Sequence, residues 1–268
     1  MIRLAANLST LFTELPFLER FAAAAAAGFT AVECQFPYEA QPRDIAARLH
    51  ANGLQWVLFN GPPGNSGERG IACLPGRERD FDAGIELAAR YVEAGNCRLV
   101  HVMAGLLPAA AERARHLDCY VQAIGRAADR LAAVGATVLL EPINSRVDVP
   151  GYLLDSTALA EECMARAARP NIRLQYDVYH MQIMQGDLLR SIQRLLPVIA
   201  HIQIADNPGR HEPGSGEIAF ERLLPGIEAL GYTGHIGCEY LPAAGTMAGL
   251  GWARHWLGNQ GGNASCTS

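Results

Sequence analysis

Short apolar runs alternate with longer amphipathic runs along the whole chain of 268 residues. The short runs are rich in β-branched and aromatic side chains and end at polar residues, which is typical of strands. The longer runs are rich in alanine and leucine, and several end at a glycine, as helices often do. We predict eight strands, at residues 3–7, 31–35, 54–60, 98–103, 137–141, 173–177, 199–204 and 235–239.

A helix is predicted after each strand. These helices span residues 14–27, 42–51, 77–94, 108–134, 156–168, 186–196, 220–230 and 246–257. Eight strand–helix units in about 250 residues match the number and length of a (β/α)8 TIM barrel, which is an α/β fold. The alternative α/β fold, a doubly wound open sheet, usually carries a glycine-rich loop after its first strand, and residues 3–10 contain no glycine.

The predicted barrel is a single domain. No linker rich in proline, glycine and serine divides residues 1–257. The last segment, residues 258–268, is rich in glycine, asparagine and serine, and we predict that it is a disordered tail.

The composition limits the chemistry and the partners. Apolar residues make up 50% of the chain and charged residues 18%, as in ordinary globular domains. All 22 residues in the Lys+Arg total are arginine, which excludes catalysis by a lysine Schiff base and a phosphate-binding loop that ends in lysine. The net charge of −5 offers no positive field to a phosphate backbone, so nucleic acid is not an expected partner.

Nothing in the sequence predicts a membrane or an exported location. The longest apolar stretch, residues 21–32, is mostly alanine and too short to span a bilayer. Glu14 and Glu19 interrupt the segment that a signal peptide would keep apolar. The seven cysteines form no CxxC pair, which indicates buried thiols in a reducing cytoplasm. Barrels of this size often form homo-oligomers, but no segment identifies an interface.

Polar side chains close four consecutive predicted strands. Glu141, Asp177 and Glu239 each end a strand, and Gln203 lies at the end of another. Side chains alternate along a strand, so these four residues should point inward at the C-terminal mouth of the barrel, where barrel enzymes carry their chemistry. Their oxygen atoms suit Mg²⁺ or Mn²⁺ better than zinc. The alternative is that each carboxylate caps the next helix or pairs with an arginine.

Other polar residues follow these strand ends. His180 comes one short turn after Asp177 and could bind a substrate oxygen or make a structural hydrogen bond. Arg210, in a polar glycine-rich loop, could hold a substrate carboxylate through two parallel hydrogen bonds. Arg69, in the loop after the third strand, could reach the same anion or remain a solvated charge. His101, inside the fourth strand, is either a substrate contact or a hydrogen-bonded barrel residue.

Four segments around these residues resemble the hydroxypyruvate isomerase family of the xylose-isomerase-like barrels. They are EPIN at residues 141–144, DVYH at 177–180, HIQIADNPGRHE at 201–212 and GCEY at 237–240. The resemblance covers essentially the whole chain, and its most specific part is the segment 201–212. It implies a divalent cation, Mg²⁺ or Mn²⁺, held by the four strand-end residues, with Glu141 and Glu239 as the acid–base residues.

The resemblance also implies an activity. Members of this family interconvert hydroxypyruvate and 2-hydroxy-3-oxopropanoate (tartronate semialdehyde), and metal-assisted proton transfer through an enediolate would achieve this. The expected partner is therefore a small hydroxy-keto acid and the enzyme an isomerase. A 2-oxo-tetronate isomerase shares the same motifs, and a ketose 3-epimerase of the same superfamily uses similar chemistry.

Two further alternatives are a DNA-repair endonuclease and a non-catalytic barrel that binds sugar acids. The acidic, lysine-free composition argues against the endonuclease. Binding alone would not require carboxylates on both sides of a ligand. The two loop arginines, Arg69 and Arg210, favour an acidic substrate over a neutral ketose.

Overall fold

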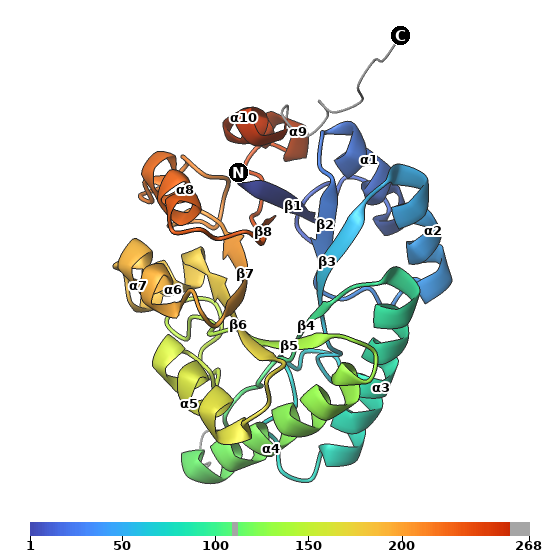
Figure 1. The fold of residues 1–268 in the computed structure, drawn as a ribbon, viewed down its shortest axis with the longest axis vertical. Coiled ribbons are helices and arrows are strands. Elements are labelled where there is room, and N and C mark those ends of the chain that lie inside the picture. Colours follow the sequence, from blue (N-terminus) through green and yellow to red (C-terminus); the bar gives the residue numbers. More distant parts are fainter. Residues whose placement is uncertain (109–111, 258–268) are drawn as a thin grey trace.

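The structure is a computed structural model that describes residues 1–108 and 112–257. Eight parallel strands close into a barrel in sequence order, and helices surround it (Figure 1). The strands are β1 Arg3–Asn7, β2 Ala31–Cys34, β3 Gln55–Asn60, β4 Leu99–His101, β5 Thr137–Leu140, β6 Ile172–Asp177, β7 Ile199–Ile204 and β8 His235–Cys238. The predicted (β/α)8 TIM barrel is confirmed. The predicted tail, residues 258–268, lies outside the described residues.

The helices follow the predicted order with local differences. They are η1 Phe17–Glu19, α1 Arg20–Ala26, α2 Pro42–Asn52, α3 Glu78–Gly95, α4 Arg113–Ala132, α5 Thr157–Ala167, α6 Val178–Met184, α7 Leu188–Leu195, α8 Phe220–Ala229, α9 Thr246–Gly249, η2 Leu250–Ala253 and α10 Arg254–Leu257. None of the helices in the described ranges is long and apolar enough to cross a membrane.

Two of these differences have a clear local cause. The predicted helix 14–27 begins only after Pro16, which is extended, because a proline disfavours the helical conformation in the residue before it. The helix α6 was not predicted, because residues 178–185 were left between the predicted strand 173–177 and the predicted helix 186–196. It begins at Val178, and the side chain of Asp177 caps it by accepting a hydrogen bond from the His180 N–H at 3.1 Å.

The barrel interior is apolar at one end and polar at the other. A small cluster of buried side chains fills the N-terminal part of the barrel: Ala5, Ala31, Val57, Leu58 and Leu139. Two positions further along three of these strands, the residues are Asn7, Glu33 and Glu141, and all three are buried. Because alternate side chains share a face, these polar groups also point inward, toward the C-terminal mouth. A much larger apolar core packs the sheet against the helices.

Candidate active site

The four residues predicted from the strand ends lie at the C-terminal mouth of the barrel. Glu141 directly follows β5, Asp177 ends β6, Gln203 lies in β7 and Glu239 directly follows β8. All four are buried, with exposed fractions of 0–4%. A cavity of about 70 Å³ opens beside them, and its polar lining is Gln35, Asn60, Arg69, His101, Glu141, Tyr152, His180, Arg210 and Glu239.

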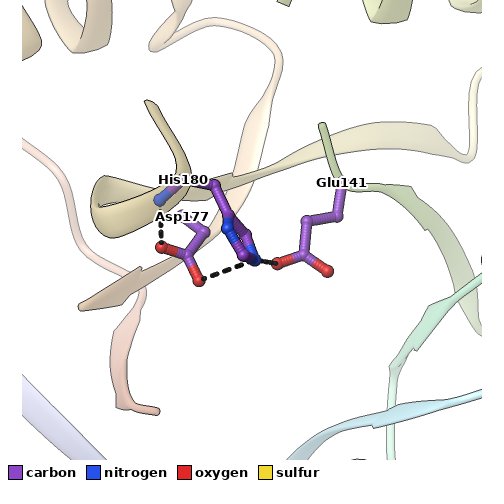
Figure 2. Close-up of side chains that lie close together, drawn as sticks. All are labelled: Glu141, Asp177 and His180. Carbon is purple, nitrogen blue, oxygen red and sulfur yellow. Dashed lines mark hydrogen bonds and ion pairs between the residues drawn. The ribbon is translucent and has the colours of Figure 1, made fainter. Parts of the chain in front are cut away.

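Glu141, Asp177 and His180 form the part of this site that could hold a metal ion (Figure 2). One ligand atom from each lies within 4.8 Å of the others. Glu141 Oε1 and Asp177 Oδ2 are buried and accept no hydrogen bond from any described residue. A buried carboxylate oxygen without a donor is costly, and a divalent cation would satisfy both oxygens.

Burial raises the pKa of each of the three carboxyl groups at the mouth, those of Glu141, Asp177 and Glu239. It raises the pKa of Glu239 from 4.5 to about 7, with Arg210 opposing the shift and the charge of Asp177 adding to it. Burial, followed by the charges of Glu239 and Asp177, raises the pKa of Glu141 well above its ordinary range. Burial likewise raises the pKa of Asp177. A bound cation would favour the ionised carboxylates, because it supplies the missing opposite charge.

Arg210 lies among acidic side chains. Its Nη1 donates a hydrogen bond to Asp148 Oδ2 at 3.1 Å. Its Nη2 lies 3.5 Å from Glu239 Oε2 and 3.9 Å from Asp177 Oδ2, and its guanidinium carbon lies 5.2 Å from the centre of the Tyr179 ring. Burial alone would lower the pKa of Arg210, but the surrounding carboxylates outweigh it and raise that pKa. Arg210 therefore balances part of the negative charge at the mouth.

Arg69 and Arg210 differ in their surroundings. Arg69 lies in the loop after β3 and lines the cavity, and its side chain makes no hydrogen bond or ion pair with another residue of the described ranges. Its exposed guanidinium is thus free to bind an anion that enters the cavity.

His101 contacts one of the predicted acid–base residues. Its Nδ1 lies 3.2 Å from Glu141 Oε2 and 3.3 Å from Asn60 Oδ1. Burial, followed by the neighbouring His180, lowers the pKa of His101 to about 3, so the ring is neutral near pH 7. His101 is a hydrogen-bonded barrel residue that also lines the cavity.

The Gln203 side chain is hydrogen bonded to Glu33 and Gln175, two residues that were not predicted from the sequence. Its Nε2 donates a hydrogen bond to Glu33 Oε1 at 2.8 Å, and its Oε1 accepts one from Gln175. Glu33 also accepts hydrogen bonds from Asn7 Nδ2 at 2.9 Å and from His201 Nε2 at 2.6 Å. These contacts fix the Gln203 amide, as outer partners do for metal ligands.

The strand β2 and the residue that directly follows it supply two supporting side chains. Glu33 contacts Gln203, and Gln35 donates a hydrogen bond to Glu239 Oε1. A Cβ at Gly237 would overlap the carboxylate of Glu33, which explains the glycine in β8. The signal that could have identified both residues is their alternation in the segment AVECQ, the pattern that located Glu141.

Known proteins are similar to this chain in sequence and in fold. Residues 21–256 match the family described as xylose isomerase-like TIM barrel. The chain is 50% identical over 261 residues to the 2-oxo-tetronate isomerase of Cupriavidus necator, covering 96% of this chain and 100% of that protein. It is 41% identical over 254 residues to the hydroxypyruvate isomerase of Escherichia coli K12, covering 94% and 98%.

A solved structure is also very similar. The crystal structure described as AP endonuclease, family 2, from Brucella melitensis superposes with a TM-score of 0.93 at 44% identity, covering 96% of this chain and 99% of that one. The two isomerases at 41–50% identity confirm the predicted enzyme class, an isomerase. With nearly all of its length matched, the chain belongs to the xylose isomerase-like TIM barrel family.

Proposed function

We propose that this isomerase interconverts hydroxypyruvate and 2-hydroxy-3-oxopropanoate. The observation that carries the proposal is the pair of buried glutamates, Glu141 and Glu239, which line one cavity together with the guanidinium groups of Arg69 and Arg210. That cavity measures about 70 Å³, whereas pockets for drug-sized ligands begin at roughly 300 Å³. A substrate of three or four carbons fits it better than a hexose.

Mg²⁺ or Mn²⁺ is the cofactor that suits these ligands. Glu141, Asp177 and Glu239 would each provide a carboxylate oxygen, and Gln203 would provide its amide oxygen. When bound, the cation polarises the substrate carbonyl and stabilises the negative charge that develops on the substrate oxygens. Glu141 Oε1 and Asp177 Oδ2, which accept no hydrogen bond from a described residue, support this assignment.

The reaction moves a carbonyl group by one carbon. One glutamate removes a proton from C3 of hydroxypyruvate, which leaves an enediolate, and the other delivers a proton to C2. The hydroxyl proton moves from the C3 oxygen to the C2 oxygen, so the product has the same formula as the substrate. Glu141 and Glu239 both line the cavity, so both can reach a bound substrate.

The remaining residues bind and orient the acid. Arg69, free of protein partners within the described residues, would hold the substrate carboxylate. Arg210 contacts the same cavity and would share that anion while balancing Glu239 and Asp177. His180 would bind a substrate oxygen, and His101 would stay hydrogen bonded to Asn60, next to Glu141 at the cavity wall.

A second candidate substrate is 2-oxo-tetronate, which the relative at 50% identity favours. It has the same carboxylate and the same reacting C2 and C3 atoms, and it differs by one additional hydroxymethyl carbon. A ketose 3-epimerase would leave Arg69 without an anion to bind, and the cavity argues against the larger ketose.

The test compares substrates on protein stripped with a chelator and then reloaded with Mg²⁺ or Mn²⁺. We expect metal-dependent turnover of hydroxypyruvate or 2-oxo-tetronate with a kcat/KM at least about 100-fold above that for a neutral ketose such as D-fructose. Absence of acid turnover with either metal, or a preference for the ketose, would contradict the proposal.

We also propose a small-molecule acid as the physiological partner and the cytoplasm as the location. The six cysteines in the described residues are all free, as expected in a reducing compartment. The crystal structure from Brucella melitensis is described as an AP endonuclease. For this chain, the net charge of −5 and the absence of lysine do not favour a nucleic-acid partner.

A further inference from the structure

Asn144 has a fixed orientation next to His180. Its Oδ1 accepts hydrogen bonds from the backbone N–H groups of Val147 at 3.0 Å and Asp148 at 2.9 Å. A backbone N–H can only donate, so the atom that faces both groups must be the amide oxygen. The Asn144 Nδ2 therefore points the other way, toward His180. Asn144 is fully buried, which removes competition from water.

The Asn144 amide determines which nitrogen of His180 carries the proton. Asn144 Nδ2 lies 2.8 Å from His180 Nδ1. An amide NH2 group only donates, so Nδ1 of the imidazole must accept and carries no proton. In a neutral imidazole the proton is then on Nε2.

The protonated nitrogen faces the carboxylates of Asp177 and Glu141 (Figure 2), and His180 lines the cavity. His180 Nε2 lies 3.8 Å from Asp177 Oδ2 and 4.0 Å from Glu141 Oε1, and both distances are too long for a hydrogen bond. The backbone N–H of His180 donates to Asp177 Oδ1 at 3.1 Å, which fixes the start of α6 and the position of the ring. The Nε2–H group can thus donate to an atom that enters between the two carboxylates.

We propose that Asn144 is a positioning residue that fixes His180 as the Nε2–H tautomer, so that His180 donates a hydrogen bond to a substrate oxygen and is not a metal ligand. A metal would need the lone pair of Nε2, and in this tautomer the proton occupies that place. That the acceptor is a substrate oxygen depends on the proposed function. The tautomer of His180 depends on hydrogen-bond geometry alone.

His101 provides an internal comparison on the other side of Glu141. Its Nδ1 lies 3.3 Å from Asn60 Oδ1, an amide oxygen that can only accept, and 3.2 Å from Glu141 Oε2. The proton of His101 is therefore on Nδ1. The two histidines that flank Glu141 hold opposite tautomers.

Nitrogen NMR of protein labelled with ¹⁵N-histidine measures these tautomers directly. Signals are assigned with the variants His180→Gln and His101→Gln. We expect an Nε2–H pattern for His180, both before and after addition of Mg²⁺, and an Nδ1–H pattern for His101. An Nδ1–H pattern for His180, or loss of its Nε2 proton when Mg²⁺ binds, would overturn the proposal.

The variant Asn144→Asp tests the cause of the tautomer. One carboxylate oxygen can still accept from Val147 and Asp148, but the other now faces His180 as an acceptor. We expect His180 Nδ1 to gain a proton. The matched control is Asp148→Asn, because Asp148 Oδ2 also lies near His180 Nδ1, at 3.9 Å. If His180 Nδ1 stays unprotonated in Asn144→Asp, or becomes protonated in Asp148→Asn, Asn144 does not set the tautomer.

Kinetics test the donor role separately. With Mg²⁺ present, we expect His180→Leu to lower kcat for hydroxypyruvate about 100-fold, and His180→Gln, whose amide can donate, to lower it less. Equal losses in the two variants would overturn the donor role. If the wild type turned over neither acid, the proposed function would fail while the tautomer result would stand by itself.

Discussion

The charged residues on the outer helices and those at the barrel mouth are arranged in opposite ways. On the outside, arginines of α4 pair one to one with acidic residues of α3: Arg126 Nε lies 3.0 Å from Asp82, and Arg130 Nε lies 2.6 Å from Glu86. These pairs are partly exposed to solvent, with side-chain exposed fractions of 33–59%. At the mouth, buried carboxylates gather around one partly buried arginine, Arg210.

This contrast separates stability from function. An exposed ion pair keeps most of its hydration, so forming it costs little and contributes little. Buried carboxylates lose their hydration, and this loss is the main cause of their raised pKa values. The fold does not need Glu141 or Glu239 to close the barrel, so these residues are expected to be necessary for chemistry and unfavourable for the stability of the metal-free protein.

The largest expected effect is that of Glu239→Gln at the mouth. This change keeps an oxygen that can face a cation but removes the group that accepts a proton, so we expect kcat to fall at least about 100-fold with a smaller change in KM. The thermal unfolding midpoint should stay the same or rise. Retention of more than about a tenth of the activity, equivalent to under roughly 1.4 kcal/mol of barrier stabilisation, would remove Glu239 from its assigned role.

Replacement of the free arginine should affect binding more than turnover. In Arg69→Gln we expect the KM for hydroxypyruvate to rise about 10-fold or more, since a hydrogen bond to a charged group contributes roughly 1.5–3 kcal/mol. Steady-state kinetics with Arg43→Gln provide the control, because the Arg43 side chain is 87% exposed and lies in α2, away from the cavity. An unchanged KM in Arg69→Gln would assign the carboxylate to another residue.

The stability of the metal-free protein should depend on pH in a defined direction. The folded-state pKa of Glu239 is about 7, above its ordinary value of 4.5. The contribution of neutral Glu239 is therefore complete below about pH 4.5 and is lost as the pH rises through about 7. We expect the unfolding midpoint of chelator-treated protein to fall between about pH 5 and pH 8, and Mg²⁺ or Mn²⁺ to raise it more at the higher pH. A metal-induced rise that is equal at both pH values, measured by calorimetry, would contradict this.

The smallest effect is expected outside the barrel. Asp82→Asn removes the partner of Arg126 in an exposed pair, so the free energy of unfolding should change by less than about 1 kcal/mol. Chemical denaturation measures that change, and kcat/KM should equal that of the wild type. A loss of activity here would mean that the outer helices and the mouth are not independent.

The sequence predicted what depends on local pattern. Strand positions followed from apolar runs bounded by polar residues, and β7 has the predicted bounds, Ile199–Ile204. The strand-end residues Glu141 and Glu239 were identified because alternation along a strand fixes which way a side chain points. Helix boundaries were less accurate where one residue decided them, as at Pro16.

The sequence did not predict contacts that require the barrel to close. Glu33 meets Gln203 across 170 positions of the chain, and Gln35 meets Glu239 across 204. Such pairs depend on the register of eight strands, which local patterns do not specify. The orientation of Asn144 toward His180 likewise depends on the hydrogen bonds of the following loop.

The central claim is that two buried glutamates move a proton between C3 and C2 of a short hydroxy-keto acid. The most direct test is turnover of hydroxypyruvate by the Mg²⁺-loaded enzyme in D₂O, with the product analysed by NMR. Because Glu239 or Glu141 would deliver a proton that exchanges with solvent, the account predicts deuterium at C2 of 2-hydroxy-3-oxopropanoate. A product that keeps the original C3 hydrogen at C2, with no deuterium incorporated, would indicate hydride transfer and contradict the account.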